Sequence, residues 1–175
     1  RPKPPFTTSK LQQAAASRLG FTGKKTMQVA QQLYEGITIG SSRIGLITYM
    51  RTDSVRISPV ALQEVRNYIK NNYPEELPEE PVYYQSAGKV QDAHEAIRPT
   101  IVDYTPDSIQ KYLNRDQYRL YALIWEQFVA SQMLPAKFLS TAYTITAGDA
   151  VFRASSSLLV QKGFYKVLQV SVSRD

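Results

Sequence analysis

Apolar residues recur at helical spacing through the first part of the chain. The stripe through residues 11–19 predicts a first helix, with Ser9 as its cap, Gln12 completing a capping box and Gly20 ending it. A second helix is predicted to follow Thr26 as its cap. Two short helices in succession are typical of a helix-turn-helix, but any helical hairpin gives the same pattern.

Four further helices are predicted before residue 134. Ser58-Pro59 opens one, residues 92–95 form a capping-box pattern that opens a short one, and Thr105-Pro106 starts another. The longest is expected over residues 116–133. The acidic, proline-rich stretch at 74–81 reads as a solvated loop.

The hydrophobic period changes after residue 134. From Phe138 onward the chain alternates or is β-branched, and Gly148-Asp149 is typical of a tight hairpin turn. Further strands are predicted at residues 151–155, 158–161 and 165–172. We therefore expect an α+β chain. Its two parts are a mainly helical domain over residues 1–134 and an incomplete, antiparallel β-rich segment over residues 135–175.

One run, GLITYMRTDS at residues 45–54, combines an apolar beginning with a polar end. It predicts a short buried strand, in which residues two apart point the same way, so Tyr49 and Arg51 share a face. A tyrosine beside a fixed cation indicates a nucleophile for phosphate chemistry. A tyrosine in an apolar strand more often simply packs, and this chain has 12 tyrosines. The loop or small β element at 36–43 leads into this run, and its role stays open.

Charge and composition narrow the range of possible functions. Residues 1–34 hold six Lys or Arg and no acid, whereas the net charge of the 175-residue chain is +6. The whole excess of positive charge therefore lies in residues 1–34. Such a region suits a polyanion partner, and it is equally consistent with a basic surface that binds no partner. The chain has no cysteine and one histidine, no signal peptide is expected, and no apolar run approaches the ~20 residues of a membrane span. It also lacks an initiator Met, and we expect it to be a piece of a longer protein.

Four segments in order resemble the central region of type IA DNA topoisomerases: PFTTSKLQQAAASRLGF (5–21), AQQLYEG (30–36), GLITYMRTDS (45–54) and AHEAIRP (93–99). The resemblance covers essentially the whole chain, and Met50 is typical of the bacterial topoisomerase I branch. It implies a winged-helix or CAP-like helical domain followed by part of the strand-passage arch. The alternative, from another class, is a non-catalytic helix-turn-helix DNA-binding module with Tyr49 in its core.

The resemblance also assigns roles to residues. By match to ITYMRTDS, Tyr49 attacks a DNA phosphodiester, which leaves the protein on the 5′ phosphate without using ATP. Arg51 would stabilise the transition state, and His94 would contact a neighbouring phosphate. Supporting positions around the nucleophile are Gln31, Glu35, Thr48, Thr52 and Asp53. Arg98 either holds a phosphate or pairs with a neighbouring acid.

The same resemblance implies cofactors and partners. Mg2+ would be bound by a domain absent from this chain, so no metal ligand and no small-molecule cofactor are expected here. The expected partners are single-stranded DNA and the remaining domains of the same polypeptide, with no membrane. The expected location is cytoplasmic, at the nucleoid. The chain alone should carry the nucleophile and yet relax no DNA.

Overall fold

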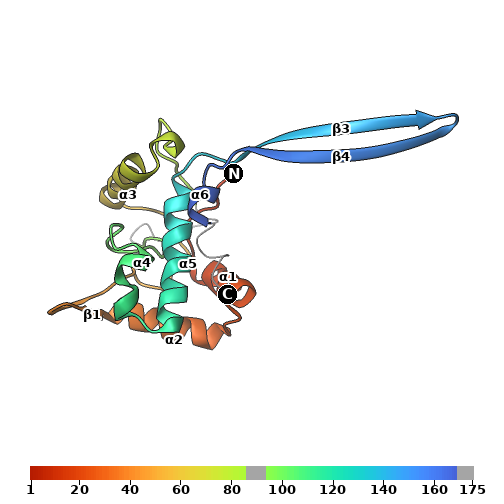
Figure 1. Cartoon of the computed structure of the whole chain (residues 1–175). Helices are drawn as coiled ribbons and strands as arrows, with labels where there is room; N and C mark the ends of the chain where they lie inside the picture. Colours follow the sequence, from red (N-terminus) through yellow and green to blue (C-terminus); the bar gives the residue numbers. More distant parts are fainter. Residues whose placement is uncertain (86–93, 169–175) are drawn as a thin grey trace.

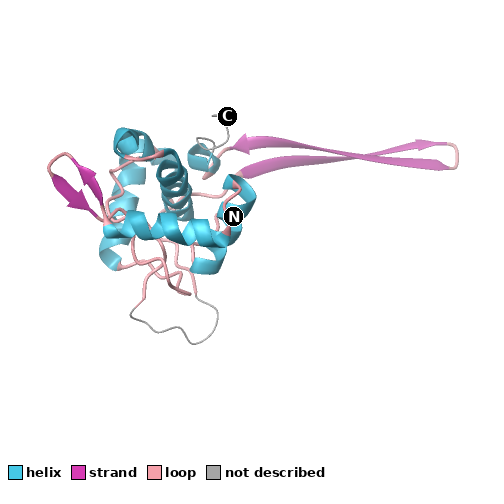
Figure 2. Cartoon of the chain, turned by 90° about the horizontal axis from the view of Figure 1, so that it is seen from below, coloured by secondary structure: helices cyan, strands magenta, loops and turns pink. Residues whose placement is uncertain are grey.

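The computed structural model describes residues 1–85 and 94–168. A helical body carries a long β hairpin that projects from one side, while a short hairpin projects from the opposite side (Figures 1 and 2). The helices are α1 (Thr8–Leu19), α2 (Gly23–Glu35), α3 (Pro59–Asn72), α4 (Pro106–Ile109), α5 (Arg115–Ser131) and α6 (Tyr165–Leu168), and the strands are β1 (Ile37–Ile39), β2 (Ser42–Ile44), β3 (Lys137–Ala147) and β4 (Ala150–Gln161). Short 3-10 turns lie at Pro74–Glu76 and Gln110–Tyr112. The expected α+β class is confirmed.

Helix α5 is the centre of the helical body, and α1, α2, α4 and α6 all contact it (Figure 1). Every residue from 120 to 131 is buried, which requires a helix that is apolar on nearly all sides. Its polar edges find partners: the Trp125 indole donates to the Val102 carbonyl at 2.9 Å. The prediction of the longest helix over 116–133 is confirmed to within two residues.

The first two helices begin earlier than predicted. Thr7, not Ser9, caps α1, because its side chain accepts the backbone N–H of Lys10. Thr22, not Thr26, caps α2, and its side chain accepts the N–H of Lys25. Thr26 is instead fully buried inside the helix, with its hydroxyl donating to the Thr22 carbonyl. Both helices exist as predicted, but their caps were assigned too late in the sequence.

The β part is a single two-stranded ribbon. Strands β3 and β4 pair antiparallel from Lys137–Gln161 to Ala147–Ala150, and the expected turn at Gly148-Asp149 joins them with Gly148 at φ 60°. The two strands predicted at 151–155 and 158–161 are one continuous strand, β4. The strand predicted at 165–172 is wrong where the structure describes it, since 165–168 form helix α6. The division into domains at 134–135 stays a prediction.

The base of the hairpin is fixed to the helical body. Leu134 N–H donates to the Glu76 carbonyl at 2.8 Å, and Phe164 N–H donates to the Leu134 carbonyl at 2.9 Å. The Lys166 ammonium of α6 lies 2.8 Å from a carboxylate oxygen of Glu76. Glu76 is only 2% exposed, so the prediction of a fully solvated acidic loop is wrong at this position.

The short helix predicted at the capping-box pattern is also wrong within the described residues. Residues 94–98 form no helix, and isolated bridges join Ile97 to Phe6 and Pro99 to Ile47. Asp92 and Ala93 lie outside the described residues. A helix ending before Pro99 would offer almost no internal hydrogen bonds, so pairing with other segments is the more stable alternative.

None of the described helices combines the length and the hydropathy that a membrane crossing requires.

Candidate active site

The segment from Tyr49 to Asp53 is not a strand of any sheet, and its backbone bends at Met50. The short buried strand predicted for the apolar beginning of the run is present only in part: Leu46 and Ile47 are buried, but Ile47 forms just an isolated bridge with Pro99. Burial nevertheless alternates along residues 49–53: Tyr49 is 47% exposed, Met50 is 1% exposed, Arg51 is exposed, Thr52 is buried and Asp53 is exposed. Tyr49 and Arg51 therefore both reach solvent on either side of a buried Met50.

Thr8, the first residue of α1, holds this segment from one side. Its hydroxyl donates to the Met50 carbonyl at 2.6 Å and accepts the N–H of Thr52 at 2.8 Å. Its own N–H donates to the Thr52 carbonyl at 2.9 Å. The backbone on both sides of Arg51 is thereby tied to the start of a helix, which restricts where the guanidinium can lie.

Thr48 holds the segment from the other side. Its hydroxyl donates to the Ala96 carbonyl at 2.7 Å and accepts the Arg98 N–H at 2.9 Å, while its own N–H donates to the Arg98 carbonyl at 2.9 Å. Thr100 extends the pairing, since its N–H donates to the Leu46 carbonyl at 3.0 Å. The Thr48 hydroxyl is thus engaged with the backbone of another segment immediately before Tyr49.

The C-terminal end of α2 sets the place of the Tyr49 ring. Leu46 N–H donates to the Leu33 carbonyl at 2.8 Å, which brings the chain back against the helix after the β1–β2 hairpin. The ring of Tyr34, on the last turn of α2, then lies 5.3 Å from the ring of Tyr49 at an interplanar angle of 59°. Tilted rings at this separation attract each other. No hydrogen bond to the Tyr49 hydroxyl comes from the described residues.

Gly45 makes this close return possible. A Cβ at this position would lie 2.7 Å from the carbonyl oxygen of Tyr34, a contact that side chains do not tolerate. The missing side chain therefore lets residue 45 cross the end of α2, and Tyr49 follows four residues later.

Arg98 pairs with a neighbouring acid, so the question left open by the sequence is answered. Its guanidinium donates to a Glu95 carboxylate oxygen at 2.9 Å, and the other Glu95 oxygen accepts the Ser58 N–H at 2.6 Å. Partial burial works to raise the pKa of Glu95, but the Arg98 charge and these hydrogen bonds outweigh it and hold the pKa below its ordinary value. The pair ties the segment that carries His94 to the cap of α3.

The remaining predicted residues lie on the surface. Gln31 and Glu35 are exposed on α2 and bond to each other at 2.8 Å, as expected for residues four apart in a helix. His94 is exposed, and its carbonyl accepts a bond from Arg56 at 3.4 Å. No hydrogen bond within the described part of the chain joins Tyr49, Arg51 or His94 to one another.

Sequence reasoning did not assign site roles to Thr8, Tyr34 and Gly45. Tyr34 lies within AQQLYEG and Gly45 begins GLITYMRTDS, but the pattern of either segment read alone does not pair them. Residues 1–85 and 94–168 contain no group of three or more His, Cys, Asp or Glu side chains that would hold a metal ion. These residues therefore do not fit a Mg2+ site.

Comparison with known proteins identifies the chain. A family model described as DNA topoisomerase matches residues 1–175. DNA topoisomerase 1 of Treponema pallidum is 59% identical over 175 residues, which are 100% of this chain and 24% of that protein. DNA topoisomerase 1 of Xylella fastidiosa is 49% identical over 173 residues, which are 97% of this chain and 21% of that protein.

A solved structure agrees with these relatives. Full-length topoisomerase I from Thermotoga maritima superposes with a TM-score of 0.82 at 45% identity, over 96% of this chain and 27% of that one. The chain therefore belongs to the DNA topoisomerase family. Within that family its relatives are type IA enzymes of the bacterial topoisomerase I kind, and it spans about a quarter of their length.

Replacing Gly45 with Ala should displace the segment that carries Tyr49. The new methyl group meets the Tyr34 carbonyl, so we expect a loss of about 1–3 kcal/mol in the free energy of unfolding, as for other overpacked sites. Urea titration measures this loss, and NMR of the tyrosine rings should show Tyr34 and Tyr49 shifted. The matched control is Gly23→Ala, where the nearest atom is a flexible Gln12 side chain at 3.7 Å, with a change within about 0.5 kcal/mol. Equal stability of both variants would contradict the close approach.

The Glu95–Arg98 pair should make part of the stability depend on acid. Because the folded-state pKa of Glu95 lies below its ordinary value of 4.5, its contribution is present above that value and is lost as the pH falls through the lowered pKa. The stability gap between the original chain and Glu95→Gln should therefore shrink from about pH 7 to about pH 3. Urea titrations at both pH values measure the gap. Glu64→Gln, at an exposed site on α3, is the control. If the difference in free energy of unfolding between the original chain and Glu95→Gln is the same at both pH values, the ion pair does not stabilise the fold.

Proposed function

We propose that this chain is the nucleophile-bearing part of a type IA DNA topoisomerase that relaxes negatively supercoiled DNA. In this proposal Tyr49 breaks one strand transiently, another strand passes through the break, and the same bond is resealed. The observation that carries it is the place of Tyr49: within the family-matched run, its ring is half exposed on a backbone that Thr8 and Thr48 hold from two sides.

The proposed reaction exchanges one phosphate ester bond for another. The Tyr49 oxygen attacks phosphorus, the new ester joins it to the 5′ phosphate, and the bond to the 3′ oxygen breaks. The phenol loses one proton and the departing 3′ oxygen gains one. A phosphodiester is exchanged for a phosphotyrosine ester, so resealing is the reverse step and needs no ATP. Phenols have an ordinary pKa of ~10, so the attack requires a base or a charge that stabilises the developing phenolate.

Arg51 is our candidate for the group that stabilises the phosphate. An exposed guanidinium two residues from the nucleophile can pair with two phosphoryl oxygens and does not lose its charge. We assign His94 to a contact with the neighbouring phosphate. Gln31 and Glu35, on the exposed side of α2, and Asp53 are proposed to bind DNA around the nucleophile. Thr48 and Thr52 are proposed to act through the backbone that they hold.

The metal and several DNA-binding surfaces belong, in this proposal, to other parts of the longer polypeptide. The described residues offer no metal cluster, so no step of the chemistry above is derived through Mg2+. The substrate is DNA that is single-stranded at the cleavage point, and the further partners are the remaining domains of the same protein.

The rival function, a non-catalytic helix-turn-helix module, requires Tyr49 to pack in the core. Its ring is instead 47% exposed, comparable to that of its neighbour Tyr34, and no described residue bonds its hydroxyl. An exposed phenol without an internal partner favours the enzyme over the module.

Replacing Tyr49 with Phe should abolish covalent attachment to DNA. The test uses the longer polypeptide that carries this segment, incubated with single-stranded DNA, denatured and resolved on a gel. The original protein should give a covalent adduct, Tyr49→Phe none, and Arg51→Ala a reduced yield with little loss of noncovalent binding. Tyr165→Phe, a tyrosine of α6, is the matched control and should leave the yield unchanged. The proposal is falsified if Tyr49→Phe still forms the adduct.

The 175-residue chain by itself should leave negatively supercoiled DNA unrelaxed when Mg2+ is present. The physical reason is that the described residues lack a metal cluster, while the proposed reaction needs groups beyond Tyr49 and Arg51. Agarose gel electrophoresis resolves the supercoiled and relaxed forms. Relaxation by this chain, absent in its Tyr49→Phe variant, would show that the chain is sufficient and would overturn this expectation.

A further inference from the structure

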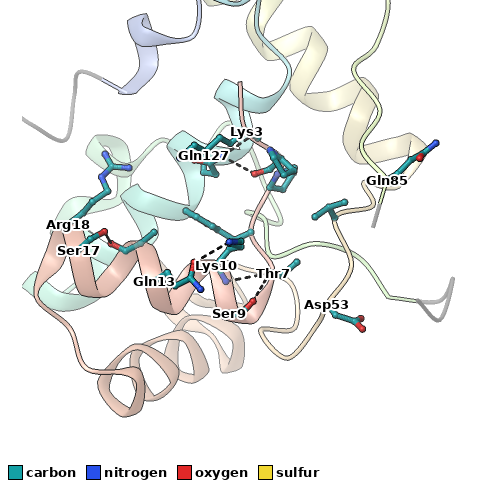
Figure 3. Close-up of a pocket in the computed structure, with 15 residues that line it drawn as sticks. Lys3, Thr7, Ser9, Lys10, Gln13, Ser17, Arg18, Asp53, Gln85 and Gln127 are labelled. Carbon is teal, nitrogen blue, oxygen red and sulfur yellow. Dashed lines mark hydrogen bonds between the residues drawn. The ribbon is translucent and has the colours of Figure 1, made fainter. Parts of the chain in front are cut away.

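A groove of about 740 Å³ runs along α1, on the side where the N-terminal segment and the segment after Arg51 meet it (Figure 3). Its floor is apolar and comes from Pro4, Pro5, Phe6 and Val55. Its edges carry hydroxyl, amide and basic side chains, which include Lys3, Lys10 and Arg18. Of the residues given a role in the proposed site, only Asp53 lines the groove, at one end.

The described lining of the groove carries more positive than negative charge. Three basic residues line it, and Asp53 is the only carboxylate among the described lining residues. Arg18 is engaged with the buried Glu126 at 3.8 Å. Lys3 and Lys10, in contrast, form no ion pair with any described residue, and Lys10 bonds only the neutral Gln13, at 3.2 Å (Figure 3). Two ammonium groups without an acidic partner therefore face the same groove.

The walls of the groove are held in place before any ligand binds. Gln127 of α5 donates to the carbonyls of Lys3 at 3.1 Å and Pro4 at 2.8 Å (Figure 3). Thr7 caps α1 at the Lys10 N–H. The backbone that carries both lysines is thus anchored to two helices, which lowers the entropy cost of binding an extended ligand.

The groove is also connected to the nucleophile. Thr8, the residue after the α1 cap, bonds the backbone at Met50 and Thr52. Asp53, at the end of the groove, is four residues from Tyr49, and four extended residues span at most about 14 Å. A strand leaving Tyr49 towards Asp53 would therefore enter the groove within two or three nucleotides. The phosphates are expected at the Lys3 and Lys10 end, where the groove carries its positive charge.

We propose that this groove is a second binding surface for single-stranded DNA, and that it holds the part of the strand that stays attached to Tyr49. The inference rests on the proposed function, because that chemistry leaves the 5′-phosphate side of the break on this chain. The apolar floor suits sugars and the faces of bases, and the two lysines suit the phosphates. In a duplex the faces of the bases are stacked inside the helix and do not reach an apolar floor, so the occupant is one strand.

The test measures binding of a fluorescent single-stranded oligonucleotide to the 175-residue chain by anisotropy at several salt concentrations. Lys3→Gln combined with Lys10→Gln removes two phosphate contacts. The slope of log affinity against log salt should fall by about 1.4, and affinity at about 0.1 M salt should fall roughly tenfold or more. The matched control is Lys70→Gln combined with Lys162→Gln, which changes net charge equally at exposed sites outside the groove lining. It should lower both quantities much less.

Three outcomes overturn the proposal. If both double variants weaken binding equally, only overall charge matters. If the groove variant binds as well as the original chain, the groove serves another occupant, such as a segment of the longer polypeptide. If a duplex binds as tightly and with the same dependence on Lys3 and Lys10, the occupant is not a single strand.

A comparison of the adduct assay with the anisotropy assay separates this inference from the proposed function. Loss of the covalent adduct tests Tyr49, whereas loss of noncovalent binding tests the groove. Either result can fail while the other holds.

Discussion

The segment from Gly45 to Asp53 belongs to no sheet, and two threonine hydroxyls hold its backbone instead. Thr8 bonds the backbone at Met50 and Thr52, and Thr48 bonds the backbone of residues 96–98. Each hydroxyl both donates and accepts, so each satisfies buried peptide groups that would otherwise be costly. Because the segment is held from α1 on one side and from residues 96–98 on the other, its alternating burial survives without strand pairing. The exposed positions of Tyr49 and Arg51 follow from this arrangement.

The charge of the N-terminal fifth is explained only partly by internal pairing. Arg18 pairs with Glu126 and Lys25 pairs with Asp116 at 2.8 Å, so these cations help to fix α1 and α2 on α5. Lys3 and Lys10 have no such partner among the described residues. The same basic region therefore serves two purposes: part of it holds the helical body together, and part of it remains available for a polyanion.

The pattern of the sequence predicted elements better than it predicted their ends. The stretch Thr7-Thr8-Ser9 offers three possible helix caps, and propensity alone does not choose between them. Thr7 is the cap because the Thr8 N–H finds its partner in the distant Thr52 carbonyl. In the same way, the capping-box pattern at residues 92–95 predicted a short helix, yet residues 94–98 form none. The Ile97 N–H donates to Phe6, and the Arg98 N–H donates to Thr48, so contacts with distant segments replace the helical bonds.

The sequence by itself determined helices α1 to α5, the long hairpin with its turn at Gly148 and the motif that carries Tyr49 and Arg51. Periodicity, turn chemistry and a short motif are local properties, and local properties can be read along the chain. Only the tertiary structure decided that the motif lies outside any sheet, that Tyr34 packs on Tyr49, that Arg98 pairs with Glu95 and that a groove lies beside α1. Each of these depends on residues brought together from distant segments, or on a close approach such as that of Gly45 to the end of α2. Such approaches are set by the packing around α5, and no local sequence pattern predicts them.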